Sequence, residues 1–506
     1  TDLEGNFQIS VLDPGSTLVF SYVGMKSEEV QLDGQTTINL TMTEDIAALE
    51  EAVVIGYGAV RKSDLTGSVV SIKNEEIERV PVVTLEQAMQ GRAAGVQVTT
   101  SSHKPGGGIS VRVRGGTSIN AGVEPLYVVD GFPVSSESRD PISNDNRFIP
   151  SAGGTSVPYN LLSTLNPNDI ESIEILKDAS STAIYGARGA NGVVLITTKR
   201  GRKGKPQVDY STHFALKKVS RKIEMLNGQE FAELYNEYNI NKGIPPLFNG
   251  ENRNYPLPED IGEGTDWQDQ IFRQGWEMNH QLSVAGGSDN TQYAISGNYN
   301  DEQGVVLGGD FTRYSIRANV DTRVIDRLKI GTNLSTSRIT ANGSGSESNT
   351  ESDFGGTIES ASVFAPTVYV YDRDGNWGEN NVPGLETRGN PVAMATLSTD
   401  KMIADRLIGN AYLDLEIIEG LNFKVSVGTN LINSRSDLYY PMETNVGRKV
   451  DGSASKSYMN TVSLLNENIL TYNNLFGGIH KVNAVAGYTR QQEVSEGSGV
   501  ETAGFV

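Results

Sequence analysis

Residues 313–321 read RYSIRANVD, a stretch in which polar and apolar side chains alternate at every position. Successive side chains of an extended chain point to opposite faces, so Tyr314, Ile316, Ala318 and Val320 share one face and the polar residues share the other. A soluble sheet turns such an apolar face inward, whereas a membrane β-barrel turns it outward toward lipid. The stretch therefore predicts a β-strand, and by itself it leaves both environments open.

The same alternation recurs through the second half of the chain, in segments of about ten residues, the length of a tilted membrane strand. Further apolar faces are carried by residues 208–216, 293–299, 421–427 and 482–488. Short connections are expected at 287–290, 325–327, 418–420 and 473–478. Longer ones are expected at about 220–278, 302–310, 339–405 and 434–456. This alternation of short turns and long loops is typical of outer-membrane barrels and favours a barrel over a soluble, repetitive β-protein.

The pattern predicts about nine antiparallel strands. A single-chain bacterial barrel needs an even number of strands to close, so we expect the sequence to stop within its barrel. It begins at Thr1, in what reads as the middle of a β-domain, with no start Met and no signal peptide. Both observations lead us to expect a fragment.

Composition narrows the class of protein. The 506 residues carry a formal net charge of -20, which argues against nucleic acid and against a polybasic membrane-surface anchor. The absence of cysteine excludes disulfides, thiolate metal sites and a cysteine nucleophile. No apolar run approaches the roughly 20 residues of a membrane helix, so a chain that spans a bilayer must do so as a closed barrel.

Four regions are expected along the chain. Residues 1–43 alternate in short bursts and predict part of a small β-sandwich, and residues 44–62 form a linker. Residues 63–200 are mixed α/β, with strands expected at 96–99, 109–113, 126–129, 170–176 and 193–198. Residues 201–506 hold the first strands of the transmembrane antiparallel β-barrel.

Several stretches of the α/β region carry a specific signature. Residues 125–131 read PLYVVDG, residues 112–115 read RVRG, and residues 165–199 read LNPNDIESIEILKDASSTAIYGARGANGVVLITTK. Together they resemble the plug domain of the SusC/RagA family of TonB-dependent transporters. The signature residues are Arg112, Arg114, Gly115, Asp130, Gly131, Tyr185, Gly186, Arg188, Gly189 and Gly192.

The resemblance implies a complete barrel of 22 strands around the plug, preceded by a carboxypeptidase-regulatory-like β-domain. It also implies import of a glycan or oligopeptide across the outer membrane of Bacteroidetes-type bacteria. The implied partners are TonB with ExbB and ExbD, and a SusD-like surface lipoprotein that acts as a lid. It implies no cofactor, no metal and no enzymatic activity, and it leaves the ligand-binding residues unknown.

The linker contains a candidate handle for TonB. Its residues are Glu51, Ala52, Val53, Val54, Ile55, Gly56 and Tyr57, which resemble the family's TonB box. Alternating β-branched residues on a flexible linker suit strand addition to a partner sheet. The alternative interpretation is a buried strand of the plug.

Other motifs have simpler explanations. The spacing of Gly186, Gly189 and Gly192 is not a dinucleotide-binding fingerprint and is typical of turns and close packing. The arginines of the plug are candidates to pair with carboxylates of the barrel wall, or with Asp130 and Glu174. Residues 372–376 begin like a calcium loop but fit a turn better. Aromatic residues of the outer loops fit either sugar stacking or rim packing; they are Trp267, Trp276, Tyr369, Tyr371 and Trp377.

Three rival functions remain beside the importer. The first is a siderophore or cobalamin receptor of the TonB-dependent type. The second is a secreted, β-rich adhesin or glycan-binding protein without a transport role. The third is an enzyme such as a glycoside hydrolase, although no nucleophile–base set or carboxylate pair stands out in the sequence.

Overall fold

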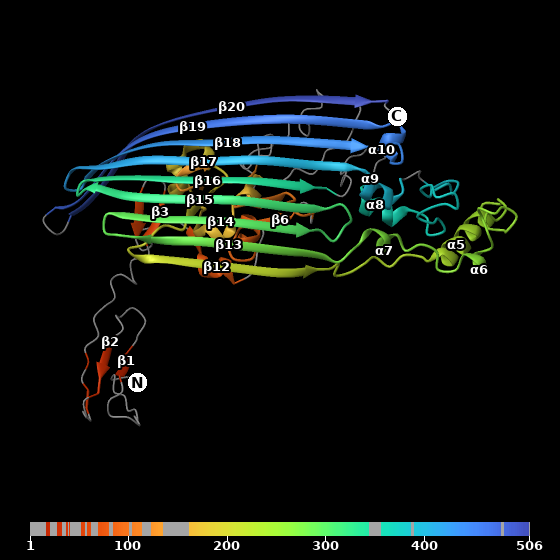
Figure 1. The fold of residues 1–506 in the computed structure, drawn as a ribbon, viewed down its shortest axis with the longest axis horizontal. Coiled ribbons are helices and arrows are strands. Elements are labelled where there is room, and N and C mark those ends of the chain that lie inside the picture. Colours follow the sequence, from red (N-terminus) through yellow and green to blue (C-terminus); the bar gives the residue numbers. More distant parts are fainter. Residues whose placement is uncertain are drawn as a thin grey trace.

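The structure is a computed structural model. It describes residues 17–20, 28–32, 37–38, 40, 52–55, 58–61, 69–79, 84–100, 104–113, 123–134, 161–343, 356–385, 389–476 and 480–504. Figure 1 shows a large curved sheet with a smaller α/β domain against its concave side. Among the described residues, no helix has the length and apolar character needed to cross a membrane.

The large sheet has nine antiparallel strands in sequence order, from β12 to β20, which confirms the predicted count. The strands are β12 (Gly204–Lys217), β13 (Gly275–Gly287), β14 (Thr291–Gln303), β15 (Asp310–Ile325), β16 (Leu328–Asn342), β17 (Thr399–Ile418), β18 (Leu421–Tyr440), β19 (Ser453–Phe476) and β20 (His480–Ala503). They hold from 13 to 24 residues, more than the ten expected. The reason is that hydrogen-bonded pairing continues beyond the segments in which the side chains alternate.

The connections alternate as predicted. Ile325 pairs with Leu328 and Ile418 with Leu421, so two-residue turns join these strands at one end of the sheet. Gly420 adopts the positive φ of 80° that such a tight turn favours. The loop helices gather at the opposite end, as Figure 1 shows. They are α5 (Gly228–Asn241), α6 (Pro258–Ile261), α7 (Trp267–Ile271), α8 (Thr357–Val363), α9 (Pro391–Leu397) and α10 (Asn445–Arg448).

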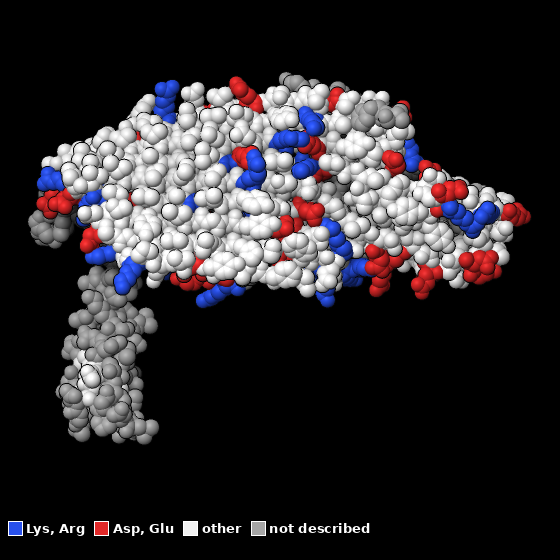
Figure 2. Space-filling view, in the orientation of Figure 1, with Lys and Arg blue, Asp and Glu red and all other residues white. Residues whose placement is uncertain are grey.

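The large sheet has the polarity of a membrane barrel. On its convex face, side chains such as Tyr210, Phe214 and Ile316 are more than 60% exposed. On its concave face, Asn300, Arg313 and Asn319 are at most 2% exposed. Figure 2 shows that the convex face carries few charges between its middle and the end with the short turns, which is itself charged. The apolar side chains therefore point away from the rest of the protein, as a lipid-facing wall requires.

The smaller domain is built on a five-stranded sheet of order β5-β10-β11-β8-β9. Its strands are β5 (Val69–Lys73), β8 (Leu126–Val129), β9 (Phe132–Val134), β10 (Ile170–Leu176) and β11 (Val193–Thr198). The strands β6 (Gln97–Thr100) and β7 (Ile109–Arg112) form a separate hairpin. All five strands expected in this region are therefore present.

Short helices complete the smaller domain. They are α2 (Asn74–Glu78), α3 (Leu85–Met89), α4 (Ala179–Thr182) and the 3-10 turns η2 (Leu161–Thr164), η3 (Pro167–Asp169) and η4 (Ala183–Gly189). Thr84 and Gln87 exchange hydrogen bonds in a capping box at the start of α3. The turn η4 is kinked at Gly186, which takes φ 58° and ψ -143°.

Near the N-terminus the described residues form two small hairpins. The strands β1 (Thr17–Phe20) and β2 (Glu28–Gln31) pair antiparallel, as do β3 (Ala52–Ile55) and β4 (Gly58–Arg61). Four of the seven predicted handle residues thus lie in β3. The other three, Glu51, Gly56 and Tyr57, lie outside the described residues, as do Arg114 and Gly115 of the plug signature.

Candidate functional site

The small domain meets the wall of the large sheet along a polar seam. Its most inserted part is the turn Asn166-Pro167-Asn168-Asp169, which leads into β10. The Asn166 side chain accepts a hydrogen bond from the Asn168 amide and so fixes the turn locally. Asn168 then donates to Asn279 of β13, at 3.3 Å. A four-residue turn thereby presents three polar side chains to the wall.

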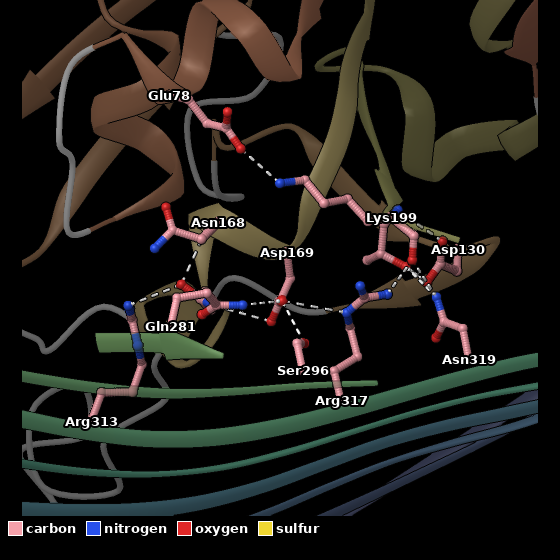
Figure 3. A network of polar contacts seen from close by, with 12 residues as sticks. Glu78, Asp130, Asn168, Asp169, Lys199, Gln281, Ser296, Arg313, Arg317 and Asn319 are labelled. Carbon is pink, nitrogen blue, oxygen red and sulfur yellow. Dashed lines mark hydrogen bonds and ion pairs between the residues drawn. The ribbon is translucent and has the colours of Figure 1, made fainter. Parts of the chain in front are cut away.

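Asp169 is the acidic centre of the seam (Figure 3). Its Oδ1 accepts hydrogen bonds from Gln281 at 3.0 Å and from Ser296 at 2.6 Å. Its Oδ2 accepts one from Asn166 at 3.1 Å, and Arg317 Nε lies 3.7 Å from Oδ1. Only 8% of Asp169 is exposed. Burying a carboxyl group is costly unless it is hydrogen-bonded, and Asp169 has three hydrogen-bond donors as well as a guanidinium nearby.

Two buried arginines of the wall hold the preceding turn, η2. Arg313 of β15 donates to the carbonyl oxygens of Ser163 at 3.0 Å and Leu165 at 3.3 Å. Arg406 of β17 donates to the Thr164 hydroxyl at 3.2 Å. A cation beside the last carbonyls of a helical turn is favourable because those carbonyls have no partner within the turn. The wall therefore supplies cations and the small domain supplies acceptors.

Strand β15 also binds residues 198–200, the exit segment through which the chain leaves the small domain. Arg317 donates to the Lys199 carbonyl at 2.7 Å. Asn319 donates to the Thr198 hydroxyl and the Lys199 carbonyl, both at 3.0 Å, and Asp321 pairs with Arg200 at 3.1 Å. These three wall residues are two apart in sequence and share the concave face. The polar face of the stretch RYSIRANVD thus forms a surface on which the small domain docks, and we call this surface the docking rail.

Asp130 joins the exit segment from within the small domain. It sits at φ 48°, followed by Gly131 at φ 88°, in the turn between β8 and β9. Its carboxylate accepts hydrogen bonds from the Thr198 amide at 3.1 Å and the Thr198 hydroxyl at 2.6 Å. Arg200 Nη2 lies 4.0 Å away, so that guanidinium is shared between Asp130 and Asp321. The positive φ of Asp130 aims its side chain at this segment.

The remaining signature residues are structural where they are described. Tyr185 is 8% exposed and packs in an apolar cluster with Leu195. Gly192 has φ 96°, and a Cβ there would meet Val113 at 2.8 Å. A Cβ on Gly189 would meet the Thr182 carbonyl at 2.9 Å. These glycines permit turns and close packing, as the sequence indicates.

The hypothesis that the signature arginines Arg112, Arg114 and Arg188 reach wall carboxylates is wrong for Arg112 and Arg188, and Arg114 lies outside the described residues. Arg188 donates to Gln491 of β20, which is an amide. Arg112 is exposed and lies opposite Gln97 in the β6–β7 hairpin. Glu174 is buried, and burial raises the pKa of its carboxyl. The fully buried cations of the seam come from β15 and β17, whereas Arg200, at the end of the small domain, pairs with the wall carboxylate Asp321.

A cavity of about 30 Å³ remains in the seam, enough for about two water molecules. It is lined by Asp130, Asp169, Arg317, Asn319, Asn333 and Asn410, among others. Among the described residues, the Oδ1 atoms of Asn333 and Asn410 have no hydrogen-bond partner. The seam is therefore held by many polar contacts and is not packed tight like an apolar core.

The comparisons with known proteins agree with this architecture. Residues 61–193 match the family of the TonB-dependent Receptor Plug Domain. The chain is 40% identical to TonB-dependent receptor P3 of Formosa agariphila, over all of this chain and 46% of that relative. It is 33% identical to TonB-dependent receptor SusC of Bacteroides thetaiotaomicron, over 85% of this chain and 41% of the relative. It spans about half the length of such relatives.

Among solved structures, the chain matches the RagAB peptide importer in its open-open state with a TM-score of 0.72 and 24% identity, over 90% of this chain and 50% of that one. The chain belongs to the SusC/RagA-type TonB-dependent receptors. Receptors of this type are outer-membrane β-barrels, so the small domain is a plug and the convex face of the sheet meets lipid. The ferric citrate transporter FecA, at 12% identity and a TM-score of 0.55, shares the fold alone.

The structure also distinguishes the buried loop aromatics of this receptor from the exposed ones. Trp267 is 3% exposed, packs edge-on against Phe364 and donates to the Ala365 carbonyl, so it is a core residue of the loops. Trp276 stacks on Phe214 of the neighbouring strand β12. Tyr371 stacks on Trp377 across a small hairpin, and both Tyr369 and Tyr371 are more than half exposed. Of the five loop aromatics, these two tyrosines are the exposed ones.

The region 372–376 is a turn, as predicted. Asp372 Oδ1 accepts hydrogen bonds from the amides of Asp374 at 2.9 Å and Asn376 at 2.8 Å. These backbone hydrogen bonds lower the pKa of the exposed Asp372 carboxyl. Within the described ranges, no cluster of His, Cys, Asp and Glu side chains is arranged to hold a metal ion.

Proposed function

We propose that the receptor imports a glycan or oligopeptide across the bacterial outer membrane and takes the energy for opening from TonB. The observation that supports this is the seam, where hydrogen bonds and ion pairs hold the plug against the concave face of the wall. Polar contacts between two preformed surfaces can be exchanged for contacts with water at modest cost. A plug held in this way can be moved by force and can return.

The proposed handle is the TonB box at residues 51–57. Its described part, β3, is already paired with β4 in a short hairpin. TonB would capture this segment by strand addition, in which backbone hydrogen bonds carry the pull without side-chain chemistry. A hairpin of four-residue strands is marginal by itself, so capture costs little.

Deleting residues 51–57 from the complete receptor tests this assignment. We expect the variant to bind its ligand as before and to lose uptake, measured with labelled ligand in cells. Uptake at the normal rate would refute the handle. Deleting the same number of residues from the preceding linker, at 44–50, is the matched control and should leave uptake in place.

We further propose a SusD-like surface lipoprotein as the partner at the outer end, with ExbB and ExbD behind TonB. The outer loops expose apolar side chains of α5, including Leu234 and Ile240, which suit a protein partner. The exposed Tyr369 and Tyr371 favour a ligand with flat apolar faces, such as sugar rings. In this proposal the protein is a transporter without catalytic activity.

A further inference from the structure

The convex face of the sheet carries a polar row that runs from β12 to β19, and Figure 2 shows charged side chains gathered near the middle of this face. We call this row the outer girdle. From β12 to β19, its members are Tyr210, His280, Tyr299, Tyr314, Arg338, Asp405, Arg435, Asp437, Lys456 and Tyr458. From His280 to Asp405, each member lies opposite the next in the strand register. Arg435 lies opposite Ile403, two residues along β17 from Asp405, so the two halves of the row meet diagonally there.

The first half of the girdle is aromatic. Tyr210 lies over His280 with ring centres 6.1 Å apart, and its hydroxyl is 2.7 Å from His280 Nδ1. His280 stacks on Tyr299 at 6.4 Å, and Tyr299 meets Tyr314 at 5.0 Å. Amphipathic rings of this kind collect where the hydrocarbon of a membrane gives way to headgroups.

The second half of the girdle is ionic. Arg338, opposite Tyr314, makes two hydrogen bonds to Asp405, at 2.6 and 2.8 Å. Arg435 pairs with Asp437 and lies 5.9 Å from the ring of Tyr458. Two lysines add to this half. Lys456 Nζ lies 3.9 Å from Asp437 Oδ1, and Lys401 lies opposite Asp437 in the strand register.

The position of the girdle places it at the outer leaflet. On β17 the outward residues between Asp405 and the short turn are apolar or glycine; they are Leu407, Gly409, Ala411, Leu413, Leu415 and Ile417. At a rise of about 3.4 Å per residue and a tilt of about 40°, this segment is about 28 Å tall, close to the apolar band of a barrel. The girdle lies at the end of this band that faces the long loops.

The ionic half carries an excess of positive charge. Four cations face two carboxylates there, in a chain whose net charge is -20. The side chains of Arg338 and Lys456 are more than half exposed, and that of Arg435 is 40% exposed. Exposed ion pairs contribute at most about 1 kcal/mol, so an incoming phosphate can take over these donors. Guanidinium groups are well suited to phosphate because they bind it through two parallel hydrogen bonds.

We propose that Arg338, Arg435 and Lys456, assisted by Lys401, bind the phosphate groups of the outer-leaflet glycolipid. The aromatic half of the girdle fixes the depth of the barrel, and the ionic half anchors it to the phosphorylated headgroups. This site faces lipid, away from the plug and the lumen. It rests on the placement of the receptor in the outer membrane and not on the identity of the imported ligand.

The test uses the complete receptor in detergent, titrated with a diphosphorylated lipid A and followed by its thermal unfolding. We expect saturable binding that the variant R338Q/R435Q/K456Q weakens at least tenfold. The matched control R323Q/R327Q/K329Q removes three exposed cations from the short-turn end of β15 and β16 and should bind like the parent. Phosphatidylglycerol is the second probe and should bind both variants and the parent weakly.

Two results would overturn the proposal. One is equal binding of lipid A by the girdle variant and the control; the other is an equal response of the parent to lipid A and phosphatidylglycerol, which would indicate general attraction to anions. The conservative variant R338K/R435K keeps the charge but cannot form the two parallel hydrogen bonds of a guanidinium to phosphate, and it should bind with intermediate affinity. Heat-modifiable migration on gels verifies that each variant is folded. Because the titration needs neither TonB nor a transported ligand, failure of the import proposal would leave its outcome unchanged.

Discussion

The plug and the wall bury opposite kinds of side chain. The plug has an ordinary apolar core, in which Ile72, Ile173 and Val194 are fully buried. The wall buries Asn300, Arg313 and Asn319 on its concave face and exposes isoleucine, leucine and tyrosine on its convex face. The two domains do touch through apolar groups, since Ile408 of β17 and Leu465 of β19 join the apolar cluster of the plug. The rest of the contact is the polar seam, which distinguishes it from the continuous apolar core of a single domain and leaves the plug a separate body.

The largest expected effect comes from removing the acid of the seam. Asp169→Ala leaves Arg317 buried without its carboxylate, and breaking a buried ion pair in this way costs about 3–5 kcal/mol. We expect the plug to unfold at a much lower urea concentration while the barrel stays intact, as monitored by hydrogen exchange of plug amides. Asp169→Asn keeps the shape and part of the hydrogen bonding and should lose less. Equal midpoints for the parent and the alanine variant would show that the seam does not hold the plug.

A second pair of variants compares the two kinds of surface directly. Ile173→Ala in the plug core removes packed methylenes and should cost about 2–5 kcal/mol. Ile316→Ala on the convex face, where the side chain is 61% exposed to lipid, should cost less than about 1 kcal/mol. The measurement is the urea midpoint of each variant in the same detergent. Similar losses at both positions would place Ile316 in a protein core and contradict the polarity of the wall.

A third variant weakens the docking rail without changing charge. Asn319→Ala removes the donor to Thr198 and Lys199, and we expect a loss of about 1–2 kcal/mol in plug stability. The neighbouring outward change Ala318→Ser is the control and should have little effect. Faster exchange confined to the amides around the exit segment would confirm that β15 holds this part of the plug.

The smallest effect is expected at Glu174, and its size depends on pH. Burial raises the pKa of this carboxyl in the folded plug. The folded state therefore holds the proton more tightly than the unfolded state, and the carboxyl costs stability once the pH rises through its folded pKa. Glu174→Gln should stabilise the plug slightly at pH 7 to 8, and the gain should vanish below the unfolded pKa of about 4.3. A loss of stability at pH 7 would show that the carboxylate has an essential partner.

Much of this architecture could be predicted because it is local. Alternation along RYSIRANVD gives the two faces of β15, and the recurrence of such segments between short and long connections gives the number of strands. The plug strands could be predicted from short apolar runs bounded by glycine. The length of the strands in the large sheet could not be predicted, because their hydrogen-bonded pairing continues beyond the segments in which polar and apolar side chains alternate. The nine strands, the plug and the family are confirmed, whereas the roles of the TonB box and of the plug signature stay predictions.

The seam could not be predicted, because its partners are far apart in sequence. Asp169 and Ser296 are 127 residues apart, and Arg406 reaches Thr164 across 242 residues. The sequence places Arg313 and Arg317 on a polar face but says nothing about what lies opposite. For the same reason the sequence suggests the signature arginines of the plug as cations of the seam, although its buried cations are Arg313, Arg317 and Arg406 of β15 and β17.

The central claim is that the convex face of the sheet meets lipid, and a site-specific probe tests it most directly. The sequence contains no cysteine, so single cysteines can be labelled selectively. We would attach an environment-sensitive fluorophore at Ile316→Cys and, as a control, at Tyr371→Cys in the outer loop, in the complete receptor reconstituted in vesicles. The account predicts that lipids with a quencher in their acyl chains quench the label at 316 and not the one at 371. Quenching of the label at 316 by a water-soluble quencher alone would contradict it.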